Sequence, residues 1–218
     1  MTLSPQLVGV QQNGSSPDYT KRMAFAAIQR AVGESRLRTV ADVGGGHGEL
    51  ARALASRSEN VLLVDYSPPD AGELPANVKP LQADLNNEWP MESGTIDFAF
   101  ALEVIEHVEN PRHFFREMKR VVKPGGHIFI TTPNNHCLAS KITFLLRGQH
   151  RYFQDPSYPA HITPLLVCDF ERMAAEMQQR VVHWSWSNYD TIPRLHWRVP
   201  LRGWMFSNVL GVLLQNSQ

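Results

Sequence analysis

Short continuous runs of apolar residues recur along the chain and predict strands that are buried on both faces. The clearest run covers residues 61–64 and ends at Asp65. Continuous rather than alternating apolar residues are typical of parallel strands that helices cover on both sides. Four more strands are predicted at residues 38–43, 78–83, 96–101 and 127–132.

Apolar residues spaced three or four positions apart predict helices between these strands. The predicted helices run from a cap at Asp18 to Gly33, over residues 49–55, from a cap at Asn110 to residue 122, over residues 138–146, and from residue 163 to 177. The third is the most clearly bounded, because Asn110 is a favoured N-cap and Pro111 a favoured first residue. Lys123, Pro124 and two glycines end it.

Two less regular strands are expected at the end of the chain, at residues 181–187 and 208–214. Strands that alternate with helices in this way predict an α/β protein with a doubly wound, mostly parallel sheet. We expect a single domain over residues 1–218, since one domain commonly holds roughly 50–250 residues. Residues 1–17 are polar and predict a loose N-terminal arm.

Composition and charge indicate the location of the protein and its class of partner, but not its reaction. The chain has 21 Lys and Arg against 21 Asp and Glu, so no global charge favours nucleic acid as a partner. Its two cysteines, Cys137 and Cys168, lie far apart and predict reduced thiols. No signal peptide is recognisable, and no apolar run reaches the ~20 residues that span a bilayer. We therefore expect a cytoplasmic protein.

Candidate ligand-binding residues fall at the ends of the predicted strands, where doubly wound sheets bind ligands. Gly44, Gly46 and Gly48 follow the first strand, and Asp65 ends the second, roughly 20 residues later. Such an acid accepts hydrogen bonds from a ribose in dinucleotide folds. The glycines have G-x-G-x-G spacing, however, whereas NAD sites have G-x-G-x-x-G. A nicotinamide-dependent oxidoreductase is therefore disfavoured.

Four segments together resemble the class I S-adenosylmethionine-dependent methyltransferases. They read DVGGGHG, LLVDYS, LQADLNNEWP and IDFAFALEVIEHVENPRHFFREMKRVVKPGGHIFITTPN. The resemblance covers about residues 40–134 and is strongest to the UbiG/MetW-like and type 11 or type 23 groups of small-molecule methyltransferases. It implies a Rossmann-like sheet of seven strands whose final pair is partly antiparallel.

The resemblance implies that S-adenosylmethionine is the cofactor. The residues it places around this cofactor are Asp42, Gly44, Gly46, Gly48, Asp65, Tyr66, Asp84, Leu85 and Leu102. Asp65 would accept from the ribose hydroxyls and Asp84 from the adenine amino group, while Leu102 or Glu103 would line the methionine end. Asp42 would orient the glycine turn or meet the cofactor's ammonium group. No Lys or Arg lies between residues 40 and 50, which suits a cofactor without a pyrophosphate.

Glu103, Glu106 and His107 are spaced i, i+3 and i+4, and so share one face if the stretch is helical. Two carboxylates and an imidazole form a partial shell for Mg²⁺ or Mn²⁺. The same E-x-x-E-H pattern contributes to a metal site in the small-RNA 2′-O-methyltransferases, which makes His161 the candidate fourth ligand. Two alternatives stay open: metal-free catalysis by His107 with Glu103 at the site, and a purely structural floor of the cofactor pocket.

Three segments are expected to form the acceptor side, at residues 19–32, 134–163 and 188–204. The second is rich in His, Arg and aromatic residues, which suits a hydroxylated small molecule such as a sugar or an anionic compound. The third is basic and aromatic, with Arg194, Arg198, Arg202, Trp197 and Trp204. It is either a surface loop or a weak contact for a phosphate, a lipid headgroup or RNA.

The function expected from these residues is methyl transfer from S-adenosylmethionine to a small molecule, most readily at a hydroxyl oxygen. In-line displacement would depend mainly on proximity and orientation, with His107 or a cation assisting deprotonation. One alternative is RNA 2′-O-methylation with a divalent metal. Another is a non-catalytic, methyltransferase-like partner subunit.

Overall fold

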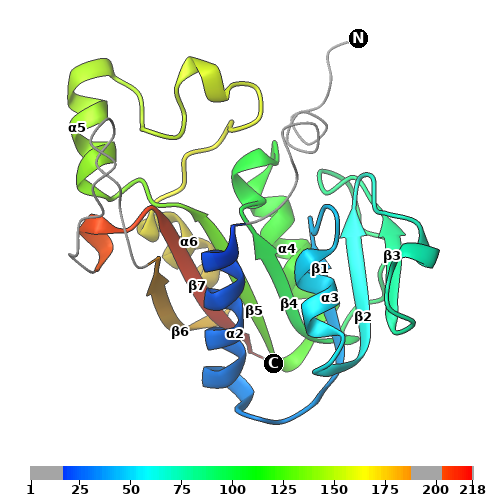
Figure 1. Ribbon diagram of the computed structural model, residues 1–218. Helices are drawn as coiled ribbons and strands as arrows, with labels where there is room; N and C mark the ends of the chain where they lie inside the picture. The colour runs from blue at the N-terminus through cyan, green and yellow to red at the C-terminus, as the bar shows by residue number, and fades with distance from the viewer. Residues whose placement is uncertain (1–16, 188–202, 218) are drawn as a thin grey trace.

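The computed structural model describes residues 17–187 and 203–217. Within this part of the chain, seven strands form one sheet in the order β3-β2-β1-β4-β5-β7-β6 (Figure 1). The strands are β1 (Leu37–Val43), β2 (Ser58–Asp65), β3 (Val78–Gln82), β4 (Ile96–Leu102), β5 (Val122–Pro133), β6 (Gln179–Trp186) and β7 (Val209–Asn216). Strands β1 to β5 pair in parallel, and β7 is antiparallel to both β5 and β6. This confirms the predicted fold class and its final antiparallel pair.

Helices cover both faces of the sheet (Figure 1). The helices are α2 (Asp18–Val32), α3 (Glu49–Leu54), α4 (Pro111–Val121), α5 (Leu138–Arg147) and α6 (Val167–Glu176). Short 3₁₀ helices are η1 (Ala71–Glu73), η2 (Ile105–His107), η3 (Asp155–Ser157) and η4 (Trp204–Phe206). Side chains of α2 and α3 pack on one face, and those of α4 and α6 pack on the other. Helix α5 stands apart from both layers (Figure 1).

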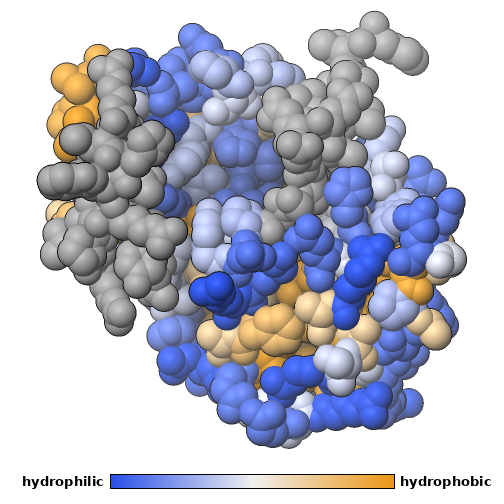
Figure 2. All heavy atoms as spheres, in the orientation of Figure 1, coloured by the Kyte–Doolittle hydropathy of each residue, from blue (hydrophilic) through white to orange (hydrophobic). Residues whose placement is uncertain are grey.

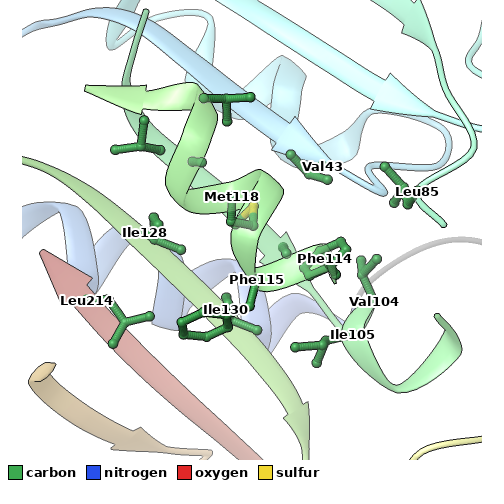
Figure 3. Packing of buried hydrophobic residues seen from close by; sticks show 14 of the residues in the cluster. Val43, Leu85, Val104, Ile105, Phe114, Phe115, Met118, Ile128, Ile130 and Leu214 are labelled. Atoms are coloured by element: carbon green, nitrogen blue, oxygen red, sulfur yellow. The ribbon is translucent and has the colours of Figure 1, made fainter. Parts of the chain in front are cut away.

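The two faces hold separate apolar cores because successive strand residues point to opposite sides. In β5, Phe129 faces the layer of α2 and α3, whereas Ile128 and Ile130 face the layer of α4 and α6. Figure 3 shows Phe115 and Met118 of α4 packed against this second side of the sheet. Parallel strands buried on both faces therefore account for the continuous apolar runs in the sequence.

Several predicted boundaries are wrong by a few residues. Asp18 is the first residue of α2 rather than its cap, which is Pro17. Strand β5 begins at Val122, immediately after α4, and not at residue 127. Helix α6 begins at Val167, and Leu166 before it has an extended backbone. The arm at residues 1–16 and the insertion at residues 188–202 lie outside the described residues.

Three further features agree with the sequence pattern. Both cysteines are free thiols, Cys137 buried and Cys168 half-buried. Helix α5 matches the weak pattern at residues 138–146, with one residue more at its end. Across residues 17–187 and 203–217, none of the helices is long and apolar enough to cross a membrane.

Candidate functional site

Strands β1 to β5 end at one side of the sheet, which we call the carboxyl edge. The turn after β1 starts this edge: Gly44 N–H donates to Val64 O at 2.7 Å, and Gly48 N–H donates to Gly45 O at 2.8 Å. Gly44, Gly46 and Gly48 have φ of 71°, 52° and 77°, a region that favours glycine. Packing also requires glycine at position 44, because a β-carbon there would lie only 2.5 Å from Val104 Cγ2.

Asp42 holds the helix that follows this turn. Its Oδ2 accepts the N–H of Ala51 at 3.0 Å, one of the amide groups that a helix N-terminus leaves unpaired. The residue is buried, and this burial, with a smaller contribution from the charge of Asp65, raises the pKa of Asp42 to about 7. The structure therefore supports the orienting role that the sequence left open for Asp42.

Asp65 ends β2 beside the glycine turn. Its Oδ2 accepts from Gly46 N–H at 2.9 Å, and its Oδ1 accepts from Ser67 N–H at 3.0 Å. A carboxylate has about four acceptor positions, so two remain after these bonds. Asp65 thus joins the ends of β1 and β2 and keeps acceptor capacity at the carboxyl edge.

Four more predicted residues lie at the same edge. Asp84 and Leu85 follow β3, Tyr66 follows β2, and Leu102 is the last residue of β4. Asp84 accepts from the N–H of Asn86 at 3.0 Å and from the Nδ2 of Asn87 at 3.1 Å, which fixes its carboxylate. Tyr66 is half-buried. Leu85 and Leu102 are buried on opposite sides of the sheet, so they contribute to the two apolar cores.

Two threonines at the end of β5 hold the segment after β4. Thr131 Oγ1 accepts from Glu103 N–H at 3.0 Å, and Thr132 Oγ1 donates to Glu106 Oε2 at 3.1 Å. Glu103 has φ of 56°, so the chain turns sharply there and only residues 105–107 are helical. The sequence pattern does not reveal these threonines, because they look like ordinary strand residues.

Each of the two glutamates has one buried oxygen without a hydrogen-bond partner among the described residues. Glu103 Oε1 and Glu106 Oε1 make no hydrogen bond to the described residues. Burial raises the pKa of Glu106 to about 8. Burial, together with the charge of Glu106, raises the pKa of Glu103 well above its usual value. Because the charge of Glu106 acts on Glu103, ionisation of one buried carboxyl group disfavours ionisation of the other.

His107 and His161 come together beside Glu106. Nδ1 of His107 lies 2.8 Å from Ala160 O, and Nδ1 of His161 lies 2.7 Å from Tyr152 O. In the neutral rings these carbonyls fix the proton on Nδ1 and leave the lone pair on Nε2. Burial lowers the pKa of both histidines.

Glu106, His107 and His161 each offer a ligand atom, and these atoms all lie within 4.8 Å of one another. Glu103 does not belong to this group. Backbone bonds from Ile162 and Thr163 to Glu106 O, of 3.0 and 3.2 Å, fasten the two segments together. The structure therefore brings His161 to Glu106 and His107 across more than 50 residues of sequence.

Tyr19 lies in the acceptor-side segment at residues 19–32 and is 39% exposed. Partial burial and the charge of Glu103 together raise the pKa of Tyr19 to about 12. Helix α2 thus places a phenol within electrostatic reach of Glu103. Its position in the first turn of an ordinary amphipathic helix gave no local signal.

Comparisons with known proteins agree with this architecture. The methyltransferase domain family matches residues 18–205. A ubiquinone biosynthesis O-methyltransferase of Acinetobacter baylyi is 34% identical over 148 residues, covering 57% of this chain and 60% of the relative. The chain thus spans less than two thirds of that relative.

Solved structures show the same fold at low sequence identity. A Bacillus halodurans protein described as a methyltransferase superposes with a TM-score of 0.66 at 15% identity, covering 92% of this chain and 99% of the other. The N-methyltransferase NodS of Bradyrhizobium japonicum, in complex with S-adenosyl-L-homocysteine, superposes at 0.61 and 12% identity, covering 95% and 91%. Since the family match extends over most of the chain, the protein belongs to the class I S-adenosylmethionine-dependent methyltransferases.

Proposed function

We propose that this protein binds S-adenosylmethionine at the carboxyl edge and transfers its methyl group to a hydroxyl oxygen of a small molecule. The observation that carries the proposal is the placement of Asp65 beside the glycine turn, with acceptor positions left over after its two backbone bonds. Ribose hydroxyls are donors that such a carboxylate recognises. Asp84 follows the neighbouring strand and would meet the adenine.

The glycine turn suits the remainder of the cofactor. Positive φ at Gly44, Gly46 and Gly48 lets backbone approach a ligand without a side chain in between. Between residues 40 and 50 there is no Lys or Arg, so the turn has no cationic clamp for a pyrophosphate. A sulfonium cofactor that carries an amino acid and a nucleoside needs no such clamp.

Oxygen is the favoured acceptor atom because His107 is a suitable base. Its lowered pKa keeps the ring neutral near pH 7, and Nε2 holds the lone pair that would accept a hydroxyl proton. The similar protein from Acinetobacter baylyi is named as an O-methyltransferase, which supports the same atom type. Proximity and orientation would supply most of the rate acceleration.

Glu106, His107 and His161 also fit a divalent cation. The fit rests on the buried, unpartnered Oε1 of Glu106 and on two imidazoles whose Nδ1 protons are fixed by carbonyls. We propose, as the alternative to base catalysis by His107, that these three residues hold Mg²⁺ or Mn²⁺, with Glu103 outside the set, since a cation on Nε2 would occupy the lone pair that a base needs. A bound cation would lower the pKa of the acceptor hydroxyl.

Cofactor affinity tests the site. Calorimetry with S-adenosylhomocysteine should show binding at least about tenfold weaker in Asp65→Asn, since a charged hydrogen bond contributes roughly 1.5–3 kcal/mol. Asp70→Asn is the matched control, because Asp70 is an exposed acid five residues further on. Equal affinities in the two variants would remove Asp65 from the cofactor site.

The acceptor is tested with radiolabelled S-adenosylmethionine and a panel of phenols, sugars and small RNAs. Labelled small-molecule ethers support the proposal. Label in RNA alone would replace it with 2′-O-methylation. Intact cofactor binding without transfer to any acceptor would favour a non-catalytic partner subunit.

A further inference from the structure

Asn86 lies two residues after Asp84 and makes hydrogen bonds to two different segments. Its Nδ2 donates to Asp84 Oδ1 at 3.2 Å, and its backbone N–H donates to the same oxygen at 3.0 Å. Its Oδ1 accepts from Glu109 N–H at 2.8 Å. Glu109 comes two residues after His107, in the segment between β4 and α4. Asn86 therefore joins the acid that would meet the adenine to the segment that carries Glu106 and His107.

Asparagine suits this bridge because its carboxamide both donates and accepts hydrogen bonds. A carboxylate only accepts and a backbone N–H only donates, so Asp84 and Glu109 together fix the orientation of the Asn86 amide. Asn86→Asp would keep only the acceptor, and Asn86→Ala would lose both groups. The neighbouring Asn87 also donates to Asp84, from Nδ2 to Oδ2 at 3.1 Å, but Glu109 N–H donates to Asn86.

The loop after β3 and the segment after β4 also share an apolar contact. Leu85 belongs to the buried cluster that contains Val104 and Ile105. Figure 3 shows Leu85 at the same end of this cluster as Phe114 and Val104. Apolar packing is not directional, whereas a hydrogen bond has a preferred distance and angle. The bond from Asn86 therefore sets the relative position of two segments that packing brings together.

The bond between Asn86 and Glu109 is accessible to water. Glu109 is exposed and Asn86 is half-buried, and Figure 2 shows a largely hydrophilic surface over β2 and β3, at the right of the view. Water competes with an exposed hydrogen bond, so such a bond opens locally more often than a buried one. A ligand bound to Asp84 would also hold Asn86, because the two residues share one turn, and would reduce this opening.

We propose that Asn86 is a positioning residue, through which the bound cofactor holds the segment that carries Glu106 and His107. The inference rests on the proposed function, in which Asp84 meets the adenine. When the nucleoside is bound, the loop after β3 is held and Asn86 Oδ1 stays on Glu109 N–H. The cofactor thus sets this segment before the acceptor binds. Because coupling between two sites is reciprocal, loss of the bond to Glu109 also weakens cofactor binding.

Amide hydrogen exchange of the full chain, resolved by residue, tests the proposal with S-adenosylhomocysteine as the probe. In the unaltered protein, saturating S-adenosylhomocysteine should slow exchange of the Glu109 amide about fivefold or more, because local opening is reduced. The Ser35 amide is the internal reference, since it lies in an exposed turn before β1, at the opposite side of the sheet. Its exchange rate should change by less than about twofold.

Asn86→Ala and Asn87→Ala form a matched pair, because each removes one amide donor to Asp84 and only the first removes the acceptor for Glu109 N–H. In Asn86→Ala, saturating S-adenosylhomocysteine should change Glu109 exchange by less than about twofold. Asn87→Ala should show the same slowing as the unaltered protein. Asn86→Asp keeps the acceptor and should restore the slowing at saturation, with weaker ligand binding because a second negative charge lies next to Asp84.

Calorimetry gives the affinity of each variant for S-adenosylhomocysteine, which sets the saturating concentration and verifies folding. Equal slowing at Glu109 in Asn86→Ala and in the unaltered protein would overturn the proposal, and so would its equal loss in Asn87→Ala. Binding of S-adenosylhomocysteine to the unaltered protein without any change at Glu109 would also overturn it, while leaving the proposed function in place. Absence of binding to the unaltered protein would remove both.

Discussion

Asp42 and Asp97 lie on neighbouring strands of the sheet and carry carboxyl groups in opposite environments. Burial raises the pKa of Asp42 to about 7. Burial also acts on Asp97, but Lys123 and the N–H groups of Thr39 and Arg38 outweigh it and hold the pKa below its usual value. The two residues should therefore contribute to stability with opposite pH dependence.

Asp42→Asn should stabilise the protein at high pH. Asp42 binds its proton more tightly in the folded state than in the unfolded state, where its pKa is 3.8, so its contribution to stability falls as pH rises from about 4 to 7. Asparagine keeps an oxygen for Ala51 N–H without a charge. Thermal unfolding should show a gain on the order of 2–4 kcal/mol at pH 8, shrinking toward pH 4. Asp97→Asn should show the reverse sign at pH 8, and a gain there instead would refute the contrast.

His107→Gln should slow methyl transfer by roughly 10²–10⁴-fold, the usual contribution of a general base. Affinity for S-adenosylhomocysteine should stay within a few-fold, because His107 is not placed on the cofactor. The rate of the unaltered enzyme should decline only below pH 6.5, since burial lowers the pKa of His107, and this acid limb should vanish in the variant. A variant with the same pH profile as the unaltered enzyme would exclude His107 as the base.

Among the elements, α4 was predicted to within one residue, because its cap and its first residue are recognisable in the local sequence. Asn110 Oδ1 accepts from His113 N–H at 2.9 Å, and Pro111 begins the helix. The start of α6 was missed by four residues because residues 163 and 164 also resemble a helix start. There, Thr163 N–H donates to Glu106 O at 3.2 Å, a tertiary contact made before the helix begins.

Asn110→Ala should lower the free energy of unfolding by about 1 kcal/mol, since the cap bond to His113 N–H is lost. For a chain of this length that corresponds to roughly 2–4 °C in Tm, measurable by circular dichroism. Asn110→Ser serves as the control, because serine can cap the same helix. If the alanine variant, the serine variant and the unaltered protein all have the same Tm, the cap does not stabilise α4.

At the scale of the whole molecule, the site depends on contacts between distant segments. Thr132 of β5 holds the carboxyl group of Glu106, and Ala160 holds the ring of His107. The same contacts bring His161 into the group of three ligand atoms within 4.8 Å. The spacing of Glu103, Glu106 and His107 indicated a shared face, but the turn at Glu103 ends that regularity and leaves Glu103 outside the group.

His161→Ala should weaken Mn²⁺ binding at least about tenfold, because one of three ligands is removed. Electron paramagnetic resonance of free Mn²⁺ measures this directly, with S-adenosylhomocysteine bound to confirm folding. His183→Ala, on edge strand β6, is the control and should bind normally. Equal Mn²⁺ affinity in both variants, or none in the unaltered protein, would refute the metal site.

The amino-acid sequence by itself determined the alternation of strands and helices, the glycine turn, and the acids at the strand ends. These features are local: buried parallel strands need continuous apolar runs, and caps and turns need particular side chains. Tertiary structure alone decided that Asp65 bonds the glycine turn, that His161 reaches Glu106, and that Asn86 accepts from Glu109 N–H. Each of these depends on which distant segments pack together, and spacing along the chain carries no information about that packing.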